Sequence, residues 1–173
     1  MDSKRTIKPG DSFLFFGLKM VALDVDSEGI TAITGRPVFD KAFDERDGSN
    51  WIACTLRHFL NANWLNASGI DIADLIKQQT EIIPDDTCES WGLAEDYVQL
   101  LTCEQYRKWR KSIPEMRTWW WTMTPFSCLP SYCYVVRLVN TSGALGSSLA
   151  NYSYGVVPRL KIRLDSEAIK PIL

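Results

Sequence analysis

Five cysteines and a single histidine are the side chains of this chain best suited to nucleophilic or metal chemistry. Their odd number and the absence of a CxxC pair argue against a disulfide framework and a structural zinc site. They are Cys54, Cys88, Cys103, Cys128 and Cys133. Cys128 and Cys133 flank a Leu-Pro-Ser-Tyr turn and could pair across it, but without an export signal we favour reduced, partly buried thiols. His58 lies in an apolar-periodic stretch, which favours packing or a surface position over catalysis.

Acidic side chains are the other candidates for chemistry. Asp85 and Asp86, and later Glu95 and Asp96, could supply oxygen ligands for calcium. No spaced set of the EF-hand kind surrounds them, and a solvated charged loop explains them as well. We therefore expect no metal, no cofactor and no enzymatic activity.

The tryptophan run in RTWWWTMTPF, residues 117–126, is the most unusual feature of the sequence. If residues 119–123 are extended, Trp119, Trp121 and Met123 point to one side, while Trp120 and Thr122 point to the other. All three indoles could be core, because large aromatic side chains fill small cores readily. Alternatively, Trp119 and Trp121 join nearby tyrosines in a stacking platform for a sugar or peptide.

A second candidate binding region is ALGSSLANYSYG, residues 144–155. Asn151, Tyr152 and Tyr154 combine rigid aromatic area with adaptable hydrogen bonding, a composition also found in antibody combining loops. The alternative is a solvated loop between two strands.

Length and composition indicate one domain over residues 1–173. The chain has 46% apolar and 23% charged residues, as in ordinary globular proteins. Its net charge of −2 gives no basic footprint for nucleic acid or lipid, so we expect neither partner. The first residues lack the apolar region of a signal peptide, and no apolar run could span a membrane. We expect a cytoplasmic protein, or a virion-associated one if it is phage-encoded.

A helix is expected to carry Cys54 and His58, two of the candidates for chemistry named first. We expect it to begin near Trp51, with Asp47 or Ser49 as its cap, and to run to about residue 64. Arg57 and Asn61 would then face water. The predicted inner stripe consists of Ile52, Leu56, Phe59, Leu60 and Asn63.

The remaining elements alternate between strand and helix patterns. Short strands are expected over residues 11–39, a second helix over 71–78, a strand over 79–84, a loop, and a strand over 96–101. Thr102 and Gln105 fit a capping box that starts another helix. Strands TWWWTM, CYVVRLV and VVPRLKIRL follow. The pattern predicts an α+β domain whose N- and C-terminal strands share one sheet.

Six ordered segments resemble a bacterial and phage domain of unknown function whose closing half reads WWLRSP, a strand with an N/S-x-G turn, and YGVRPAL. The corresponding segments here are WWTMTP (120–125), CYVVRLVNTSGAL and YGVVPRL (154–160). FGLKMVALDV, SNWIACTLRHFLNANWLN and DYVQLLTCEQY are similar to its earlier segments.

This resemblance implies a C-type-lectin-like fold, with small twisted antiparallel sheets, two to three packed helices and binding carried by loops. Met123 and Val157 stand where the family has arginines, which suggests that the two positions share one environment. Arg159 lies on the same side of a strand as Val157 and could replace the lost arginines in holding an anionic group.

Three functions remain open. We favour a non-enzymatic recognition module that binds a glycan or a surface protein through Trp119, Trp121, Asn151, Tyr152, Tyr154 and Arg159. A phage or prophage gene is the setting that the resemblance suggests for it. The alternative is an assembly protein that forms oligomers through an exposed aromatic face, although the sequence leaves the oligomeric state open. A third is an oxidase related to formylglycine-generating enzymes, in which Cys128 and Cys133 would bind copper. The lectin-like assignment requires the indole-rich segment and VVPRL to be neighbours in one sheet, covered by helix 51–64.

Overall fold

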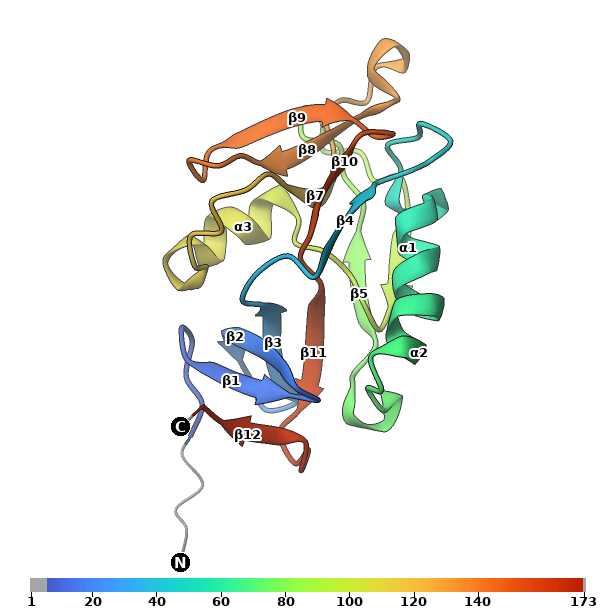
Figure 1. Cartoon of the computed structure of the whole chain (residues 1–173). Coiled ribbons are helices and arrows are strands. Elements are labelled where there is room, and N and C mark those ends of the chain that lie inside the picture. The colour runs from blue at the N-terminus through green and yellow to red at the C-terminus, as the bar shows by residue number, and fades with distance from the viewer. Residues whose placement is uncertain (1–5, 173) are drawn as a thin grey trace, which may run out of the picture.

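The computed structural model describes residues 6–172 and is a mixed α+β structure dominated by strands (Figure 1). Two five-stranded sheets and a two-stranded ribbon are combined with short helices. This confirms the α+β class predicted from the sequence.

The first sheet joins both ends of the described chain. Its order is β11-β3-β2-β1-β12, and every pair is antiparallel. The expectation that N- and C-terminal strands share a sheet is therefore confirmed. On β11, Lys161 Nζ contacts Asp26 Oδ2 at 2.9 Å and Glu28 Oε2 at 3.1 Å, which ties β11 to the turn between β2 and β3. The strands are β1 (Ser12–Phe15), β2 (Leu18–Val25), β3 (Gly29–Thr34), β11 (Arg159–Arg163) and β12 (Ile169–Pro171).

The second sheet contains the tryptophan run. Its order is β4-β10-β7-β8-β9. The β10–β7 pair is parallel, with Gly155 opposite Trp120, and the other pairs are antiparallel. The strands are β4 (Phe39–Ala42), β7 (Trp120–Pro125), β8 (Val135–Val139), β9 (Leu145–Leu149) and β10 (Ser153–Val156).

The VVPRL segment does not stay in one sheet, so the predicted ladder with the indole-rich segment is only half present. Val156 ends β10, beside β7, whereas Arg159 begins β11, which pairs with β3 in the other sheet. Pro158 lies at the crossing. Because proline has no N–H to donate to a ladder, it is a natural point for the chain to leave one sheet and enter the other.

The helix expected near Trp51 is present and runs as four consecutive pieces. Its cap is Asn50, whose Oδ1 accepts a hydrogen bond from Ile52 N at 3.1 Å, and not Asp47 or Ser49 as predicted. Of the predicted inner stripe, Leu56 and Leu60 are buried and Asn63 is exposed. The pieces are a 3-10 turn (Trp51–Ala53), α1 (Thr55–Phe59), a π turn (Leu60–Trp64) and α2 (Leu65–Ala67).

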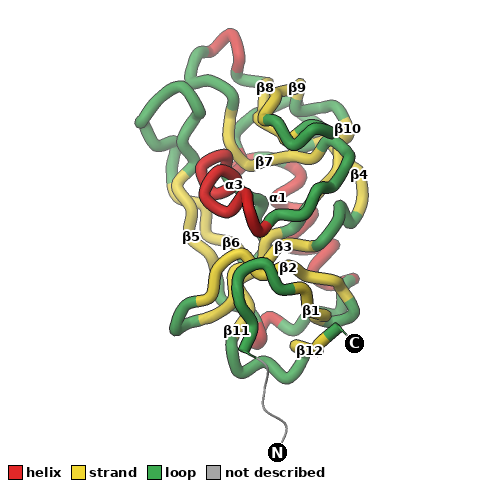
Figure 2. Tube along the Cα trace, turned by 90° about the vertical axis from the view of Figure 1, so that its left-hand side faces the viewer, coloured by secondary structure: helices red, strands yellow, loops and turns green. Residues whose placement is uncertain are grey.

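Helix α3 (Cys103–Trp109) begins as predicted. The Thr102 hydroxyl accepts from Gln105 N at 3.1 Å, and the Gln105 side chain accepts from Thr102 N at 3.0 Å, which completes the capping box. A 3-10 turn (Arg110–Ser112) follows. Figure 2 shows α3 lying across the junction between the second sheet, above it, and the first sheet, below it. Its buried Tyr106 belongs to a core cluster that includes side chains of both.

The segment between these helices differs from the prediction. The helix expected over 71–78 is only a 3-10 turn (Ile72–Asp74), capped by Asp71. The chain then pairs with β11, because Leu75 forms a bridge with Ile162 and Ile76 N donates to Lys161 O at 2.8 Å. Strand β5 (Gln78–Glu81) follows and pairs with β6 (Leu93–Asp96). Strand β6 lies in the expected loop and ends where the strand over 96–101 was expected to begin.

Strand β7 is buried on both sides. Trp121 and Met123 belong to the larger core cluster, and Trp120 belongs to the smaller one. The predicted alternation of side chains along this strand is therefore confirmed. Val157 belongs to the smaller cluster, so the environment that Met123 and Val157 were expected to share is not present.

Candidate functional site

Trp119 and Tyr154 form an aromatic pair on the surface of the second sheet. Trp119 directly precedes β7 and is 40% exposed. Its indole is stacked on the Tyr154 ring, with 5.5 Å between centroids and 22° between planes. Beneath them, the buried Trp121 meets the Tyr154 ring edge-on at 5.0 Å. We call Trp119 and Tyr154, with Trp121 below, the aromatic surface.

Gly155 allows this stacking. Its N–H donates to Trp119 O at 2.9 Å. A Cβ atom at position 155 would lie 2.9 Å from that same oxygen and 3.0 Å from Pro37 Cγ, closer than side-chain carbons normally approach. A glycine is therefore required for β10 to come close enough to the start of β7.

Polar contacts fix the orientation of the rings. The Tyr154 hydroxyl and Ser148 Oγ lie 2.9 Å apart and share a hydrogen bond. Trp121 Nε1 donates to Lys41 O at 2.9 Å on the neighbouring part of the sheet. The exposed indole of Trp119 is thus supported by side chains that are themselves held in place, so little freedom is lost when a ligand binds to it.

Asn151 and Tyr152 lie in the turn between β9 and β10, next to the aromatic surface along the chain. Both are exposed, and Tyr152 is 52% exposed. Tyr152 N donates to Leu149 O at 3.1 Å, which closes the turn. The structure therefore brings Trp119, Trp121 and Tyr154 into contact and presents Asn151 and Tyr152 to solvent.

Arg159 lies apart from these residues, in the interior. It is 4% exposed, and its Nη2 donates to Gln99 Oε1 at 2.5 Å and to Thr80 Oγ1 at 3.1 Å. The same nitrogen lies 3.9 Å from Met123 Sδ. Burial lowers the pKa of Arg159 to about 9. We expected that Arg159 could hold an anionic group. In this structure its guanidinium is instead enclosed by protein groups.

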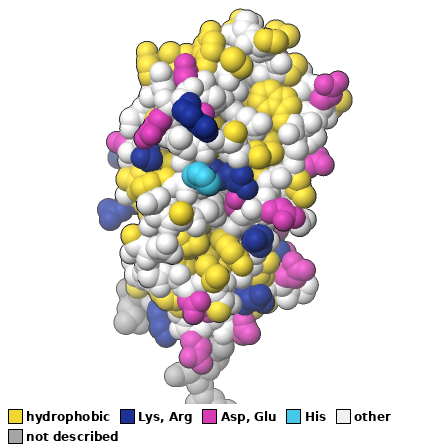
Figure 3. All heavy atoms as spheres, turned by 90° about the vertical axis from the view of Figure 1, so that its right-hand side faces the viewer, with side chains coloured by type: hydrophobic (Ala, Val, Ile, Leu, Met, Phe, Trp, Pro, Cys, Tyr) yellow, Lys and Arg dark blue, Asp and Glu magenta, His cyan; other side chains and the backbone are white. Residues whose placement is uncertain are grey.

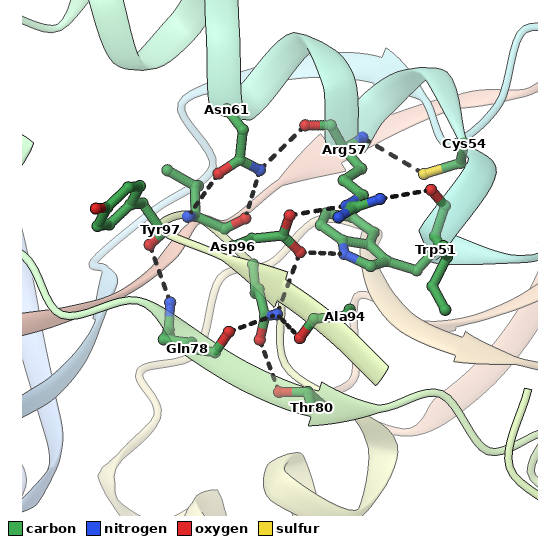
Figure 4. A network of polar contacts seen from close by, with 12 residues as sticks. Trp51, Cys54, Arg57, Asn61, Gln78, Thr80, Ala94, Asp96 and Tyr97 are labelled. Atoms are coloured by element: carbon green, nitrogen blue, oxygen red, sulfur yellow. Dashed lines mark hydrogen bonds and ion pairs between the residues drawn. The ribbon is translucent and has the colours of Figure 1, made fainter. Parts of the chain in front are cut away.

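A polar network joins the start of the first helix to β6 (Figure 4). Asp96, only 6% exposed, accepts from Arg57 Nε at 2.7 Å, Trp51 Nε1 at 3.0 Å and Gln99 Nε2 at 3.2 Å. Arg57 was predicted to face water. It turns inward instead, because the buried Asp96 carboxylate needs a cationic partner.

Asn61 was also predicted to face water, and it also turns inward. Its Oδ1 accepts from Val98 N and its Nδ2 donates to Val98 O, both at 2.9 Å, so that one side chain satisfies both backbone groups of Val98 (Figure 4). These contacts join residues far apart in the sequence, and no local pattern in the sequence could have revealed them.

Three of the cysteines have a raised pKa, which makes their thiols poor nucleophiles. Burial raises the pKa of Cys54 to about 12 and raises the pKa of Cys103. Desolvation, together with the nearby Asp86 carboxylate, raises the pKa of Cys128. A raised pKa lowers the fraction of reactive thiolate at neutral pH.

All five cysteines carry free thiols, and Cys128 and Cys133 are exposed and unpaired. Cys54 and Cys103 are buried. Across residues 6–172, no group of three His, Cys, Asp or Glu side chains is placed to hold a metal ion. The two thiols flanking the Leu-Pro-Ser-Tyr turn thus have no third ligand of these types among the described residues.

Two hollows lie away from the aromatic surface. One, of about 440 Å³, is lined by Ser27, Glu28, Ile76 and residues 163–165. The other, of about 190 Å³, lies between the end of α3 and the turn at 140–143. None of the six predicted site residues lines either of these two hollows.

The face that carries α1 and α2 has charged side chains of both signs interspersed with apolar ones (Figure 3). It offers no extended field of one sign to a charged partner. None of the helices that the structure describes is both long and apolar enough to cross a membrane.

No protein-family model, curated protein or solved structure matches this chain.

Proposed function

We propose that this protein is a non-enzymatic recognition domain that binds a glycan on the aromatic surface. The observation that carries the proposal is the exposed indole of Trp119, held parallel to the Tyr154 ring. Tryptophan and tyrosine provide large, rigid contact area at low cost in conformational entropy. The apolar C–H face of a sugar ring fits such a flat platform.

Polar groups beside the platform supply hydrogen bonds for sugar hydroxyls. Asn151, Tyr152 and Ser153 are exposed in the turn and at the start of β10. An exposed ring face such as that of Trp119 suits a unit of a longer polymer better than a small molecule, which binds mostly in enclosed pockets. We therefore infer a polysaccharide or a surface glycan as the ligand, and a surface protein as the alternative.

The resemblance to bacterial and phage domains adds the proposed setting, a phage- or prophage-encoded protein associated with a virion or present in the cytoplasm. The crossing of the chain at Pro158 removes part of the ladder on which the lectin-like assignment depended. The proposal of glycan binding consequently depends on the aromatic surface and not on that ladder.

A glycan array and a pull-down with bacterial cell-wall polysaccharides test the proposal. Trp119→Ala should weaken binding about tenfold or more, which corresponds to about 1.4 kcal/mol. Tyr154→Ala and Tyr152→Ala should also weaken it. Tyr132→Ala is the matched control, because Tyr132 is 43% exposed and lies in the loop between β7 and β8. Binding that survives Trp119→Ala and Tyr154→Ala would disprove the proposed site.

One observation favours an assembly role as a second candidate. The loop between β7 and β8 exposes Leu129, Tyr132 and Tyr134 by 52%, 43% and 38%. Such a group of apolar side chains is typical of a protein contact. Leu129→Ser with Tyr132→Ser should then reduce the mass measured by light scattering, whereas an unchanged mass would exclude this loop as the contact.

A further inference from the structure

Strand β9 forms an open edge of the second sheet. Within residues 6–172, β8 is the only strand bonded to it. Ala150 N donates to Tyr134 O, and Asn140 N donates to Ala144 O. The backbone N–H and C=O groups of the even-numbered residues of β9 therefore point toward β8. In an antiparallel ladder the bonding direction alternates along the strand. Leu145, Ser147 and Leu149 therefore point their N–H and C=O groups away from the sheet, where the Leu149 carbonyl already accepts one hydrogen bond from Tyr152 N and keeps its second lone pair free.

This edge lacks the features that normally prevent edge-to-edge pairing. No Asp, Glu, Lys or Arg occurs between Arg137 and Arg159, and β9 contains no proline. The β8–β9 register runs through Val135↔Leu149 to Val139↔Leu145 without a shift, so no bulge bends the edge away. Soluble proteins usually protect an exposed edge with charges, prolines or bulges.

The β9 sequence, Leu-Gly-Ser-Ser-Leu, is nearly symmetric about Ser147. When two copies pair antiparallel about this residue, Leu145 of one copy lies opposite Leu149 of the other, and the two Ser147 residues exchange both N–H···O bonds. A contact with twofold symmetry uses the same patch on both copies, and this strand is complementary to itself.

We propose that two copies of this chain dimerise through β9, which joins their second sheets into one continuous sheet. The occupant of the edge is thus another copy of the same strand. The half-buried Leu145 and Leu149 side chains add apolar contact beside the new backbone bonds. The proposal is independent of glycan binding, since the exposed Ser147 makes none of the contacts of the aromatic surface.

Charge placed at the symmetry axis tests the dimer. In a bonded antiparallel pair the facing Cα atoms are about 5.5 Å apart, so Ser147→Lys sets two like charges against each other. We expect the wild type to form a dimer in sedimentation velocity. Ser147→Lys and Ser147→Glu should each self-associate at least tenfold more weakly. An equal mixture of the two variants should form a mixed dimer. Ser131→Lys places the same charge at an exposed position in the loop between β7 and β8, the alternative contact, and should leave the β9 dimer intact.

Each outcome decides the proposal. Restoration of the dimer in the mixture requires the two 147 positions to face one another, and it also shows that the separate variants are folded. A wild type that stays monomeric at several hundred micromolar would refute the proposal. A dimer that persists in both single variants would refute it as well, and would point to another contact such as the loop between β7 and β8. Glycan binding is measured on monomeric Ser147→Lys as well. If that variant still binds the glycan, the dimer and the glycan site are independent, and one proposal can fail without the other.

Discussion

Replacing Asp96 by asparagine tests whether the buried polar network stabilises the fold. Asp96 is 6% exposed and accepts hydrogen bonds from Trp51, Arg57 and Gln99. Asparagine keeps the volume of the side chain, so no cavity opens. However, it turns one acceptor oxygen into an NH₂ group that faces another donor, and it removes the charge that pairs with Arg57.

The expected cost follows from these contacts. A lost hydrogen bond to a charged group costs about 1.5–3 kcal/mol, and an unpaired buried donor adds about 1–3 kcal/mol. The Arg57 side chain is 27% exposed, so water compensates part of its lost partner. We therefore expect Asp96→Asn to lower the free energy of unfolding by about 2–4 kcal/mol.

Urea denaturation followed by tryptophan fluorescence measures this change. With a denaturant slope of about 2 kcal/mol per molar urea, the midpoint should fall by about 1–2 M at an unchanged slope. Glu95→Gln is the matched control, because Glu95 is the exposed neighbour on β6 and bonds only to Gln79 among the hydrogen bonds of the described residues. Its effect should stay within about 0.5 kcal/mol.

Equal midpoints for Asp96→Asn and Glu95→Gln would refute this reasoning. That result would mean that the donors bound to Asp96 find other hydrogen-bond acceptors, and that the network does not stabilise the fold.

Three further predictions concern a backbone contact, an ion pair and a thiol. Gly155→Ala should cost about 1–3 kcal/mol and reduce the near-ultraviolet circular dichroism, because its new Cβ would meet Trp119 O; an unchanged spectrum would contradict this. The hydrogen bond from its lysine partner lowers the pKa of Asp26 to about 2, so the stability it contributes is present above the unfolded pKa near 3.9 and is lost as pH falls toward 2. Asp26→Asn should therefore make the melting temperature depend less steeply on pH between about 4 and 2. If the melting temperature of the variant falls with pH as steeply as that of the wild type, the ion pair of Asp26 with Lys161 is not a cause of the fall. Because desolvation and the nearby Asp86 carboxylate raise the pKa of Cys128, Asp86→Asn should speed its alkylation by iodoacetamide at pH 7, measured by mass spectrometry, and a slower reaction would contradict this assignment.

Local patterns in the sequence predicted local structure well. The alternation along β7 follows from the period of an extended chain, and it correctly separated Trp121 from Trp120. The capping box at Thr102 is likewise a short-range pattern, in which both partners lie within one turn. Trp119 and Tyr154 were named as candidate binding residues from separate segments, and the structure brings them into contact, whereas their role in binding stays a prediction.

Pairings between distant segments could not be predicted. Arg57 and Asn61 lie on a helix face that the apolar period assigns to water, and only the later chain supplies Asp96 and Val98 as their partners. The helix expected over 71–78 failed for the same reason, since β11 offers Leu75 a strand partner that competes with a helical turn. In each case a tertiary contact outweighed a local preference.

The chain switches sheets at Pro158, so residues near the C-terminal end complete both sheets. Strand β10 inserts between β4 and β7, and β11 then covers the edge of β3. During synthesis, β3, β4 and β7 therefore keep unpaired edges until β10 and β11 emerge from the ribosome. Contacts of such long sequence separation slow folding and expose edges to aggregation. This domain is consequently expected to complete its fold only after β10 and β11 have left the ribosome, and nascent chains that stall before residue 159 should require chaperones.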